Sequence, residues 1–493
     1  MQWHILILAL VFLLIPFFIG TSFAQLDKFT FSAIKSSFVK QKTTKAPAPT
    51  SDQTNSQTGH SGELGGTDST KIRLIVWEGA IDAWKNNPIF GTGVETFAFA
   101  YYKYRPPAHN LTSEWNFLYN KAHNEYLNYL ATTGLFGLGT YLSIILAFFW
   151  IIFDKALKRF KVKELSFELL LVLALFAGYL SILVSNFFGF SVVIVNIYFF
   201  LIPALTLVLL EIVSKEKAIA FSTNKNSASA KAKAQKVKTY REDKYKTSGL
   251  QKFGILIIIA VSLYFVYYLY VAWIADKSYA LGMNLDRAQQ YQQAYQNLKT
   301  ATDLLPSEPV FTDELAINNA VLSLMVLQSQ KNATGSAALA SQLAQSAITL
   351  TDKVTTEHPN NVVFAKTKVR VFYTLSQANP QYLPLALQAI QKAQLLAPTD
   401  ANISYNLGVL YGQNGQIQKA IDTLQNTTKL KPDYRNAYYA LGIFYHQAAL
   451  DKNGKVTNKN NLKKAIETMK FIVKNLAPSD AQAKQAIKTW ENQ

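Results

Sequence analysis

His123 is the side chain in this sequence best suited to moving a proton. It is followed by Asn124 and lies in the stretch AHNEYLNYLATTGLFGLG at 122–139, which becomes apolar after its first few residues. A neutral imidazole accepts a proton near neutral pH, so His123 could deprotonate a hydroxyl group. A helix beginning at His123 would place three apolar residues on the face of the imidazole: Tyr126, Leu127 and Leu130. The alternative is a helix-terminal histidine held by nearby backbone, and the residues alone leave both open.

Arg73 and Trp77 lie one turn apart on a predicted helix that begins at Ser69 or Thr70 and ends before Pro88. The guanidinium group of Arg73 could hold a diphosphate through its fork of N–H donors. The alternative is an ordinary exposed helix arginine. For Trp77 the alternative to substrate contact is packing at a membrane surface.

Gly91 and Gly93 flank Thr92 between this helix and a second helix predicted over 94–104. Free backbone N–H groups at the start of a helix bind phosphate oxygens, so this turn could contact a phosphorylated substrate. The alternative is a simple turn after Pro88.

Several other kinds of site are excluded or unsupported. The chain has no cysteine, which excludes disulfides, thiolate metal sites and cysteine nucleophiles. It also has no P-loop, zinc pattern, nucleophile elbow or dinucleotide fingerprint, so we expect neither a cofactor nor a metal. Glu95, Glu114 and Glu125 could orient an acceptor or bind a cation, but they form no pair that demands a metal. His109 and Asn110 repeat the His–Asn pair without the glycines that follow His123, so we treat them as secondary.

Long apolar segments position these residues at a membrane. Of the 493 residues, 49% are hydrophobic and 16% charged, which indicates that part of the chain is solvated by lipid. Five membrane spans are predicted, at 1–20, 135–153, 167–188, 192–213 and 253–274. The first could instead be a signal peptide with a cleavage site at 22–24, although no Lys or Arg precedes it.

The formal charge of +18 follows from basic loops rather than from a nucleic-acid site. Dense Lys and Arg runs at 155–164 and 215–252 predict that these two loops face the cytoplasm. The region 25–133 and the C-terminal third then lie on the outer side. Five lysines between 28 and 45 argue for the opposite orientation, but the later runs are denser and adjoin span ends.

The C-terminal third is soluble in character and contains repeats. Leu407-Gly408 recurs as Leu441-Gly442, at the period of 34 that is typical of tetratricopeptide helix pairs. An alanine precedes a proline by twelve or thirteen residues four times: Ala294 and Pro306, Ala386 and Pro398, Ala420 and Pro432, Ala465 and Pro478. Such pairs stack into a solenoid, because one pair cannot bury its apolar face alone.

Three motifs occur in a fixed order: Arg73-Leu-Ile-Val-Trp77, then Asn-Pro88-Ile-Phe-Gly91-Thr-Gly93, then Ala122-His123-Asn124 followed by Gly134 and Gly137. This ordered set resembles the O-antigen ligase and polymerase superfamily over roughly residues 70–210. The resemblance implies a metal-independent, inverting membrane glycosyltransferase that moves an undecaprenyl-diphosphate-linked glycan to a glycan, lipid or protein acceptor.

The resemblance also implies roles for the residues that carry it. His123 would be the general base or would position the acceptor, and Arg73 would hold the donor diphosphate. Four further residues would contact substrate: Asn124, Trp77, Gly91 and Gly93. Family members usually carry many more spans before this loop, which leaves three interpretations open: a truncated gene product, one half of a split enzyme, or an inactive remnant. In the last case the chain would be a membrane-anchored scaffold whose repeats bind a protein partner.

We therefore predict an all-α protein, with an integral membrane helical domain, an external helical loop and a soluble tetratricopeptide solenoid. The expected regions are a transmembrane or signal-like helix at 1–24, a flexible external loop at 25–69, a ligase-like domain at 70–213, a basic cytoplasmic linker at 214–252, a transmembrane helix at 253–275 and the repeats at 276–493. The expected location is the bacterial cytoplasmic membrane, with several spans and with 25–133 and the repeats outside.

Overall fold

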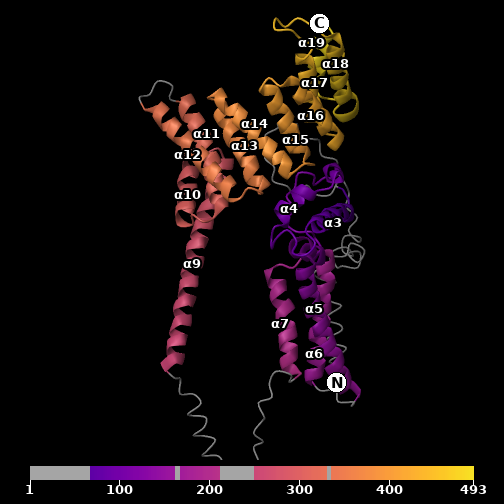
Figure 1. Cartoon of the computed structure of the whole chain (residues 1–493), viewed down its shortest axis with the longest axis vertical. Helices are drawn as coiled ribbons and strands as arrows, with labels where there is room; N and C mark the ends of the chain where they lie inside the picture. The colour runs from indigo at the N-terminus through magenta and orange to yellow at the C-terminus, as the bar shows by residue number, and fades with distance from the viewer. Residues whose placement is uncertain (1–66, 162–166, 211–248, 330–334) are drawn as a thin grey trace, which may run out of the picture. The chain divides into compact units, whose positions relative to one another are not determined.

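A computed structural model describes residues 67–161, 167–210, 249–329 and 335–493. The helix expected at 1–24, nearly all of the loop expected at 25–69 and most of the linker expected at 214–252 lie outside these described residues. The described residues are helical, and their sole β-type pairing is an isolated bridge between Leu450 and Val456. The all-α prediction is confirmed (Figure 1).

Two short helices and a 3₁₀ turn form a small packed unit before the first long apolar helix. Helix α3 (Ser69–Asn86) starts at Asp68, whose carboxylate accepts from the Thr70 N–H at 2.6 Å. Helix α4 (Phe97–Tyr104) and turn η2 (Pro107–Leu111) follow. The apolar side chains of α3 and α4 share one core: Ile72, Val76, Ala80, Ala83, Phe97 and Tyr101. The prediction that the second helix starts at residue 94 is wrong by three residues, because the Thr96 hydroxyl bonds back to the Gly93 carbonyl at 2.6 Å.

Helix α5 (Glu125–Lys161) joins the stretch after His123 and the first described apolar segment into one element with a kink at Gly134. Gly134 has φ +66°, so the helical hydrogen-bond ladder breaks there. The segment 88–93 fills the break. The N–H groups of Thr92 and Gly93 donate to Ala131 and Thr132, and those of Leu135 and Phe136 donate to Pro88 and Ile89, all at 2.8–3.1 Å. The kink is thus built jointly by two segments that are about 40 residues apart in sequence.

Helices α6 (Phe167–Phe188) and α7 (Val193–Leu209) pack against α5 through a core rich in aromatic rings, including Tyr141, Tyr179 and Phe199. By length and composition, four described helices could cross a membrane, within 125–155, 167–188, 252–287 and 309–328, and α7 is apolar but shorter at 17 residues. In the most apolar part of helix α9 (Gly249–Arg287) no residue is buried, as expected for a helix solvated by lipid. The chain is a membrane protein.

The helix at 309–328 belongs to the solenoid rather than to the membrane. This helix, α11 (Pro309–Ser329), is 56% buried in its most apolar part and holds buried polar groups. Asp313 accepts from the Thr367 hydroxyl at 2.7 Å, and Ser323 donates to the Ala340 carbonyl at the same distance. These bonds join α11 to neighbouring solenoid helices, which a lipid environment would not supply.

The solenoid is a series of antiparallel helix pairs (Figure 1). Its first pair is the end of α9 with α10 (Tyr291–Leu304), and four more follow: α11 with α12 (Ser336–Glu357), α13 (Val362–Ser376) with α14 (Leu383–Leu396), α15 (Ala401–Gln413) with α16 (Ile417–Leu430), and α17 (Arg435–Gln447) with α18 (Lys459–Phe471). The remaining elements of the solenoid are the 3₁₀ turn η3 (Pro380–Tyr382), the π-helical turn η4 (Ile472–Leu476) and a final helix, α19 (Ala481–Trp490).

The repeated glycines and alanines hold the two helices of a pair close together. A Cβ on Gly408 would stand 2.7 Å from the Leu424 side chain, and one on Gly442 would stand 2.8 Å from Met469. The four alanines predicted from the spacing are all fully buried on second helices. Sequence reasoning missed the pair α11 and α12, although Ala347 and Pro359 show the same spacing of twelve and Ala347 is also fully buried.

Candidate functional site

His123 lies just outside helix α5, in a left-handed backbone conformation with φ +55°. The prediction that the helix starts at His123 is therefore wrong, and the three apolar residues do not share a helical face with its ring. Asn124 caps the helix instead, since its side-chain oxygen accepts from the Leu127 N–H at 3.0 Å. Few non-glycine residues adopt this conformation, which marks His123 as a strained position of the kind that is frequent at functional sites.

The imidazole of His123 has one nitrogen bound and one free. Nδ1 lies 3.1 Å from the Lys121 carbonyl oxygen, which only accepts, so Nδ1 carries the proton. Within the described part of the chain Nε2 has no hydrogen-bond partner, and it therefore presents a lone pair. Burial lowers the pKa of His123 below 6.5, and the charge of Arg73 lowers this pKa further. The hydrogen bond to the Lys121 carbonyl and the charge of the Glu114 carboxylate raise it, but their effect is smaller. The ring is neutral at pH 7 and can accept a proton at Nε2.

The rings around His123 come from two separate segments. Tyr119 lies edge-on at 5.4 Å between centroids, and Phe190, in the turn between α6 and α7, lies edge-on at 5.3 Å. Tyr119 donates its hydroxyl proton to the Glu114 carboxylate, and burial raises the pKa of this tyrosine. Sequence reasoning named neither Tyr119 nor Phe190. The one signal that could have indicated them is the frequency of aromatic residues in both segments, around Tyr119 and around Phe190.

Arg73 reaches the same group of residues from α3. Its charge lowers the pKa of both His123 and Tyr119, so the guanidinium group acts electrostatically on this group of residues. Arg73 is half-buried and has no ion pair or hydrogen bond to any described residue. Arg73 therefore influences His123 through its charge, and its donor fork is unoccupied within the described part of the chain.

Trp77 lies one turn after Arg73, and its ring packs edge-on against Phe187 of α6 at 5.8 Å. Its indole N–H is buried and has no partner among the described residues. A buried donor without an acceptor costs free energy. A bound substrate that accepts a hydrogen bond from this N–H would recover that free energy. This observation motivates keeping Trp77 as a substrate contact, which stays a prediction.

Gly91 and Gly93 do not present free N–H groups, so this part of the prediction is wrong. The N–H of Gly91 donates to the Asn87 carbonyl at 3.0 Å, and those of Thr92 and Gly93 donate to α5. A Cβ on Gly91 would stand 2.3 Å from the Thr132 carbonyl carbon, so the residue is small because two backbones touch there. Their assignment to substrate binding stays a prediction.

His109, the second histidine of a His–Asn pair, has both nitrogens occupied. Nε2 lies 3.2 Å from the Glu114 carbonyl oxygen and must donate, while Nδ1 lies 2.9 Å from the Tyr101 hydroxyl and accepts. Burial, followed by the charge of Arg105, lowers its pKa to about 4. His109 is therefore a neutral structural residue with no lone pair to offer, in contrast to His123.

Glu125 connects His123 to the turn between α6 and α7. This carboxylate is 5% exposed and accepts from the Ser191 N–H at 3.3 Å. Ser191 in turn donates to Asn186 at 2.9 Å, and Asn186 donates to the Tyr141 hydroxyl at 3.2 Å. Buried polar groups therefore line one side of the site. In the described residues, no group of three His, Asp or Glu side chains is placed to hold a metal ion.

The loop that carries this site contacts the solenoid through buried polar groups. The Arg105 guanidinium group, 3% exposed, donates to Asn110 at 2.5 Å, and Asn110 donates to the Thr399 carbonyl at 2.8 Å. Lys431 donates to the Asn110 carbonyl at 2.9 Å, and its ammonium group lies 4.6 Å from the centre of the Trp115 ring. Tyr102 of α4 is buried in the core of the pair α13 and α14.

The N-terminal and C-terminal parts of the chain are similar to different known proteins. Residues 1–142 match the family model described as O-antigen ligase. This match includes the N-terminal residues that the motif comparison left out, and it ends before α6 and α7, whereas we expected it to extend to residue 210. No curated protein matches the chain.

Solved structures similar to the C-terminal part are tetratricopeptide proteins. A thermophilic one from Thermus thermophilus is 17% identical, with a TM-score of 0.31, and the similarity covers 44% of this chain and 100% of that chain. MamA from Desulfovibrio magneticus is 21% identical over 42% and 98%, with a TM-score of 0.31. YrrB, a tetratricopeptide protein with an unusual peptide-binding site, is 16% identical over 43% and 90%, with a TM-score of 0.30. In this chain the tetratricopeptide assignment stands on the 34-residue period and the helix pairs.

Proposed function

We propose that the chain is a membrane glycosyltransferase that transfers a polyprenyl-diphosphate-linked glycan to an acceptor hydroxyl. One observation carries the proposal: Nδ1 of His123 is bound to the Lys121 carbonyl, which leaves Nε2 free to accept a proton, and the charge of Arg73 favours the neutral imidazole. The family match over residues 1–142 supports the coarser role. The finer chemistry, the choice of donor lipid and its independence from metal are part of the proposal.

The proposed step forms one bond and breaks one. The acceptor oxygen attacks the anomeric carbon of the donor sugar while its proton passes to Nε2 of His123. The bond from the anomeric carbon to the diphosphate oxygen breaks, and the lipid diphosphate leaves with the electron pair. Arg73 stabilises the charge that develops on that diphosphate, since its planar fork can bind two oxygens at once.

The outer face of a bacterial cytoplasmic membrane is the proposed location of the site. The basic runs at 155–164 and 215–252 favour a cytoplasmic position for the loops between the later spans. The contacts of Asn110 with Thr399 and Lys431 require the loop and the solenoid to share one side. Among the described residues, four apolar helices separate them, α5, α6, α7 and α9, and an even number of crossings returns the chain to that side.

A second candidate function is a membrane-anchored scaffold whose solenoid binds a protein partner outside the cytoplasm. Its support is a cleft of about 440 Å³ on first helices α13 and α15, lined by Arg370, Tyr373 and Asn406 among others. The scaffold would need neither the free lone pair of His123 nor the unpaired Arg73. This difference separates the two candidates in one experiment.

The test is His123→Asn in the full chain. Asparagine tolerates the left-handed backbone at this position but is no base near neutral pH, so the fold is retained while the proton acceptor is lost. We expect glycan transfer, followed by electrophoresis of the acceptor, to fall about 10²–10⁴-fold. Membrane abundance should match the wild type. Half-buried His446, whose ring stacks on Trp490 at the far end of the solenoid, provides the control, His446→Gln, which should transfer normally. An unchanged glycan profile in His123→Asn would leave the scaffold as the better account.

A further inference from the structure

Two adjoining clefts connect the solenoid to the loop that carries the proposed transfer site. The first, of about 570 Å³, is lined by α12, α13 and α14 and includes Asp352, Lys368 and Gln388. The second, of about 700 Å³, lies between α4 and the solenoid and includes Thr92, Phe99 and Lys103. Both clefts are lined by the same four residues where they meet: His358, Pro359, Asn361 and Lys392. Together they form one groove.

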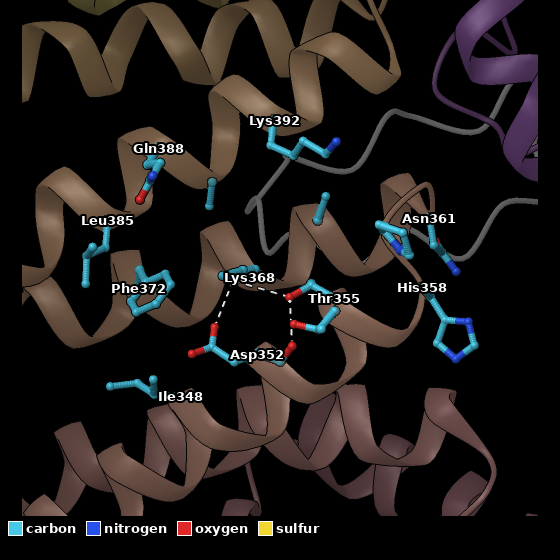
Figure 2. Close-up of a pocket in the computed structure, with 14 residues that line it drawn as sticks. Ile348, Asp352, Thr355, His358, Asn361, Lys368, Phe372, Leu385, Gln388 and Lys392 are labelled. Atoms are coloured by element: carbon cyan, nitrogen blue, oxygen red, sulfur yellow. Dashed lines mark hydrogen bonds and ion pairs between the residues drawn. The ribbon is translucent and has the colours of Figure 1, made fainter.

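The solenoid half of the groove combines polar groups with a larger apolar surface. Figure 2 shows Lys368 between Asp352 and Thr355, with Gln388 and Lys392 on the neighbouring helix. Lys368 pairs with Asp352 at 2.8 Å and donates to the Thr355 hydroxyl at 3.3 Å, so its position is fixed. Gln388 and Lys392 are exposed and available to a ligand.

The loop half of the groove adds hydroxyl and amide groups together with aromatic and apolar surface. Thr92, Thr96 and Asn360 supply the polar groups, while Phe99 and Leu395 are 38% and 73% exposed. Lys103 and Lys392 make no ion pair with any described residue. Sugars are bound in proteins by such a mixture, in which amides, hydroxyls and ammonium groups bond to sugar hydroxyls and apolar surface covers ring C–H groups.

The loop end of the groove lies close to the proposed transfer site. Thr92 donates its backbone N–H to Ala131 at 3.0 Å, and Ala131 lies six residues after Glu125 on α5. Six residues of helix span about 9 Å. The groove therefore ends roughly 9 Å along α5 from Glu125, which lies two residues after His123. A chain lying in the groove would have one end close to that histidine.

We propose that this groove binds an extended saccharide chain and guides it between the solenoid and His123. The two clefts together are far larger than one sugar, and their polar lining continues from α14 to Thr92. The inference rests on the proposed function, because it assigns the groove to the donor or acceptor glycan of that reaction. The solenoid thereby contributes to substrate binding.

Site-specific photocrosslinking in the producing cells tests the groove without knowledge of the sugar. A p-benzoyl-phenylalanine placed at Gln388 or Leu395, both exposed groove residues, should form adducts under ultraviolet light. After purification and protease digestion, these adducts should stain for carbohydrate. The matched controls are Lys463 and Gln485, exposed on α18 and α19, which should give at least fivefold less carbohydrate. Lys392→Gln should lower the yield from the Gln388 position severalfold.

The outcomes distinguish the groove from the proposed reaction. Carbohydrate adducts at Gln388 and Leu395 but not at the controls support the groove. Transfer by the wild type with no carbohydrate at these positions overturns the groove and leaves the reaction standing. Adducts that contain peptide instead of sugar also overturn it. Carbohydrate adducts in a chain that transfers nothing would keep the groove as a saccharide site and reject the reaction.

Discussion

At the scale of single residues, the chemistry depends on which nitrogen of each histidine is free. His109 donates from Nε2 and accepts at Nδ1, whereas His123 donates from Nδ1 and leaves Nε2 open. The two share a neighbour, because Tyr119 packs edge-on against both rings. Arg73 acts on His123 by charge alone, since a nearby cation disfavours the imidazolium form. The effect of Arg73 on the pH dependence of the reaction can therefore be separated from its proposed binding of the donor diphosphate.

We predict that Arg73→Gln shifts the acid limb of the pH–rate profile to higher pH. His123 must be neutral to act as a base, so activity falls as pH drops through its pKa, which lies below 6.5. Removing a cation that lowers this pKa lets it rise, and the limb moves with it. The rate at pH 8 should also fall about tenfold or more, because hydrogen bonds to charged groups contribute roughly 1.5–3 kcal/mol. The measurement is transfer rate between pH 5 and 9.

Arg73→Lys is the matched control for this prediction. Lysine keeps the charge, so the acid limb should stay in place, while the rate falls because a point charge cannot bind two oxygens in a plane. An acid limb that does not move in Arg73→Gln would show that Arg73 and His123 do not interact as described.

At the scale of elements, the site depends on the joint between segment 88–93 and the kinked helix α5. The kink frees backbone groups of Ala131, Thr132, Leu135 and Phe136, and segment 88–93 bonds to all four. A buried backbone group left without a partner costs about 1–3 kcal/mol, so each of the two segments stabilises the other. The joint holds segment 88–93 against the first turns of helix α5, the helix that begins two residues after His123.

We predict that Gly134→Ala and Gly91→Ala prevent assembly of this joint. A Cβ on Gly134 would stand 2.3 Å from the Ile89 carbonyl oxygen, and both glycines have positive φ. The left-handed conformation alone costs an alanine roughly 1–2 kcal/mol, and the backbone contacts cannot move aside. The amount of full-length protein in membranes should fall severalfold, by immunoblot. Gly139→Ala, five residues on with open space around it, should accumulate normally.

The sequence predicts helices better than it predicts this joint. Helix α6 has the bounds predicted from hydropathy, because a run of apolar residues between polar ends needs no distant partner. The kink, the left-handed turn at His123 and the approach of Phe190 depend on segments far apart in the chain, which local periodicity does not report. The motif order identified Gly91 and Gly93, and the sequence analysis assigned them to phosphate binding, because free and bonded N–H groups look alike in a sequence.

At the scale of the whole molecule, the solenoid holds the loop that carries the site. Lys431 is 6% exposed and contacts the Asn110 carbonyl and the Trp115 ring, and the adjacent loop residue, His109, bonds to Tyr101. Loss of this lysine would leave a carbonyl without its donor and a ring without its cation. Each such contact contributes on the order of 1 kcal/mol, enough to loosen the loop but too little to unfold the solenoid.

We predict that Lys431→Ala increases access to the loop while the solenoid stays folded. A single cysteine introduced at Thr112, a loop residue that is 4% exposed, should react severalfold faster with a thiol reagent in purified Lys431→Ala protein of this otherwise cysteine-free chain. Glycan transfer should decrease in the same variant. Exposed Lys429, two residues away on α16, provides the control, Lys429→Ala, which should leave both unchanged. Equal reactivity in the two variants would mean that the solenoid does not hold the loop.

The same contacts require a topology that can be tested directly. Because Asn110 bonds to Thr399 and Lys431, single cysteines at Ser113 and at Asn458 should react from the same side of the membrane. The positive-inside bias predicts that this side is the outer one, so both should react with a membrane-impermeant thiol reagent on intact cells stripped of any outer barrier. A cysteine at Ser229, in the second basic run, should react only after the cells are opened. Labelling of Ser229 alone on intact cells would place His123 in the cytoplasm, where a transferase acting at the outer face could not work.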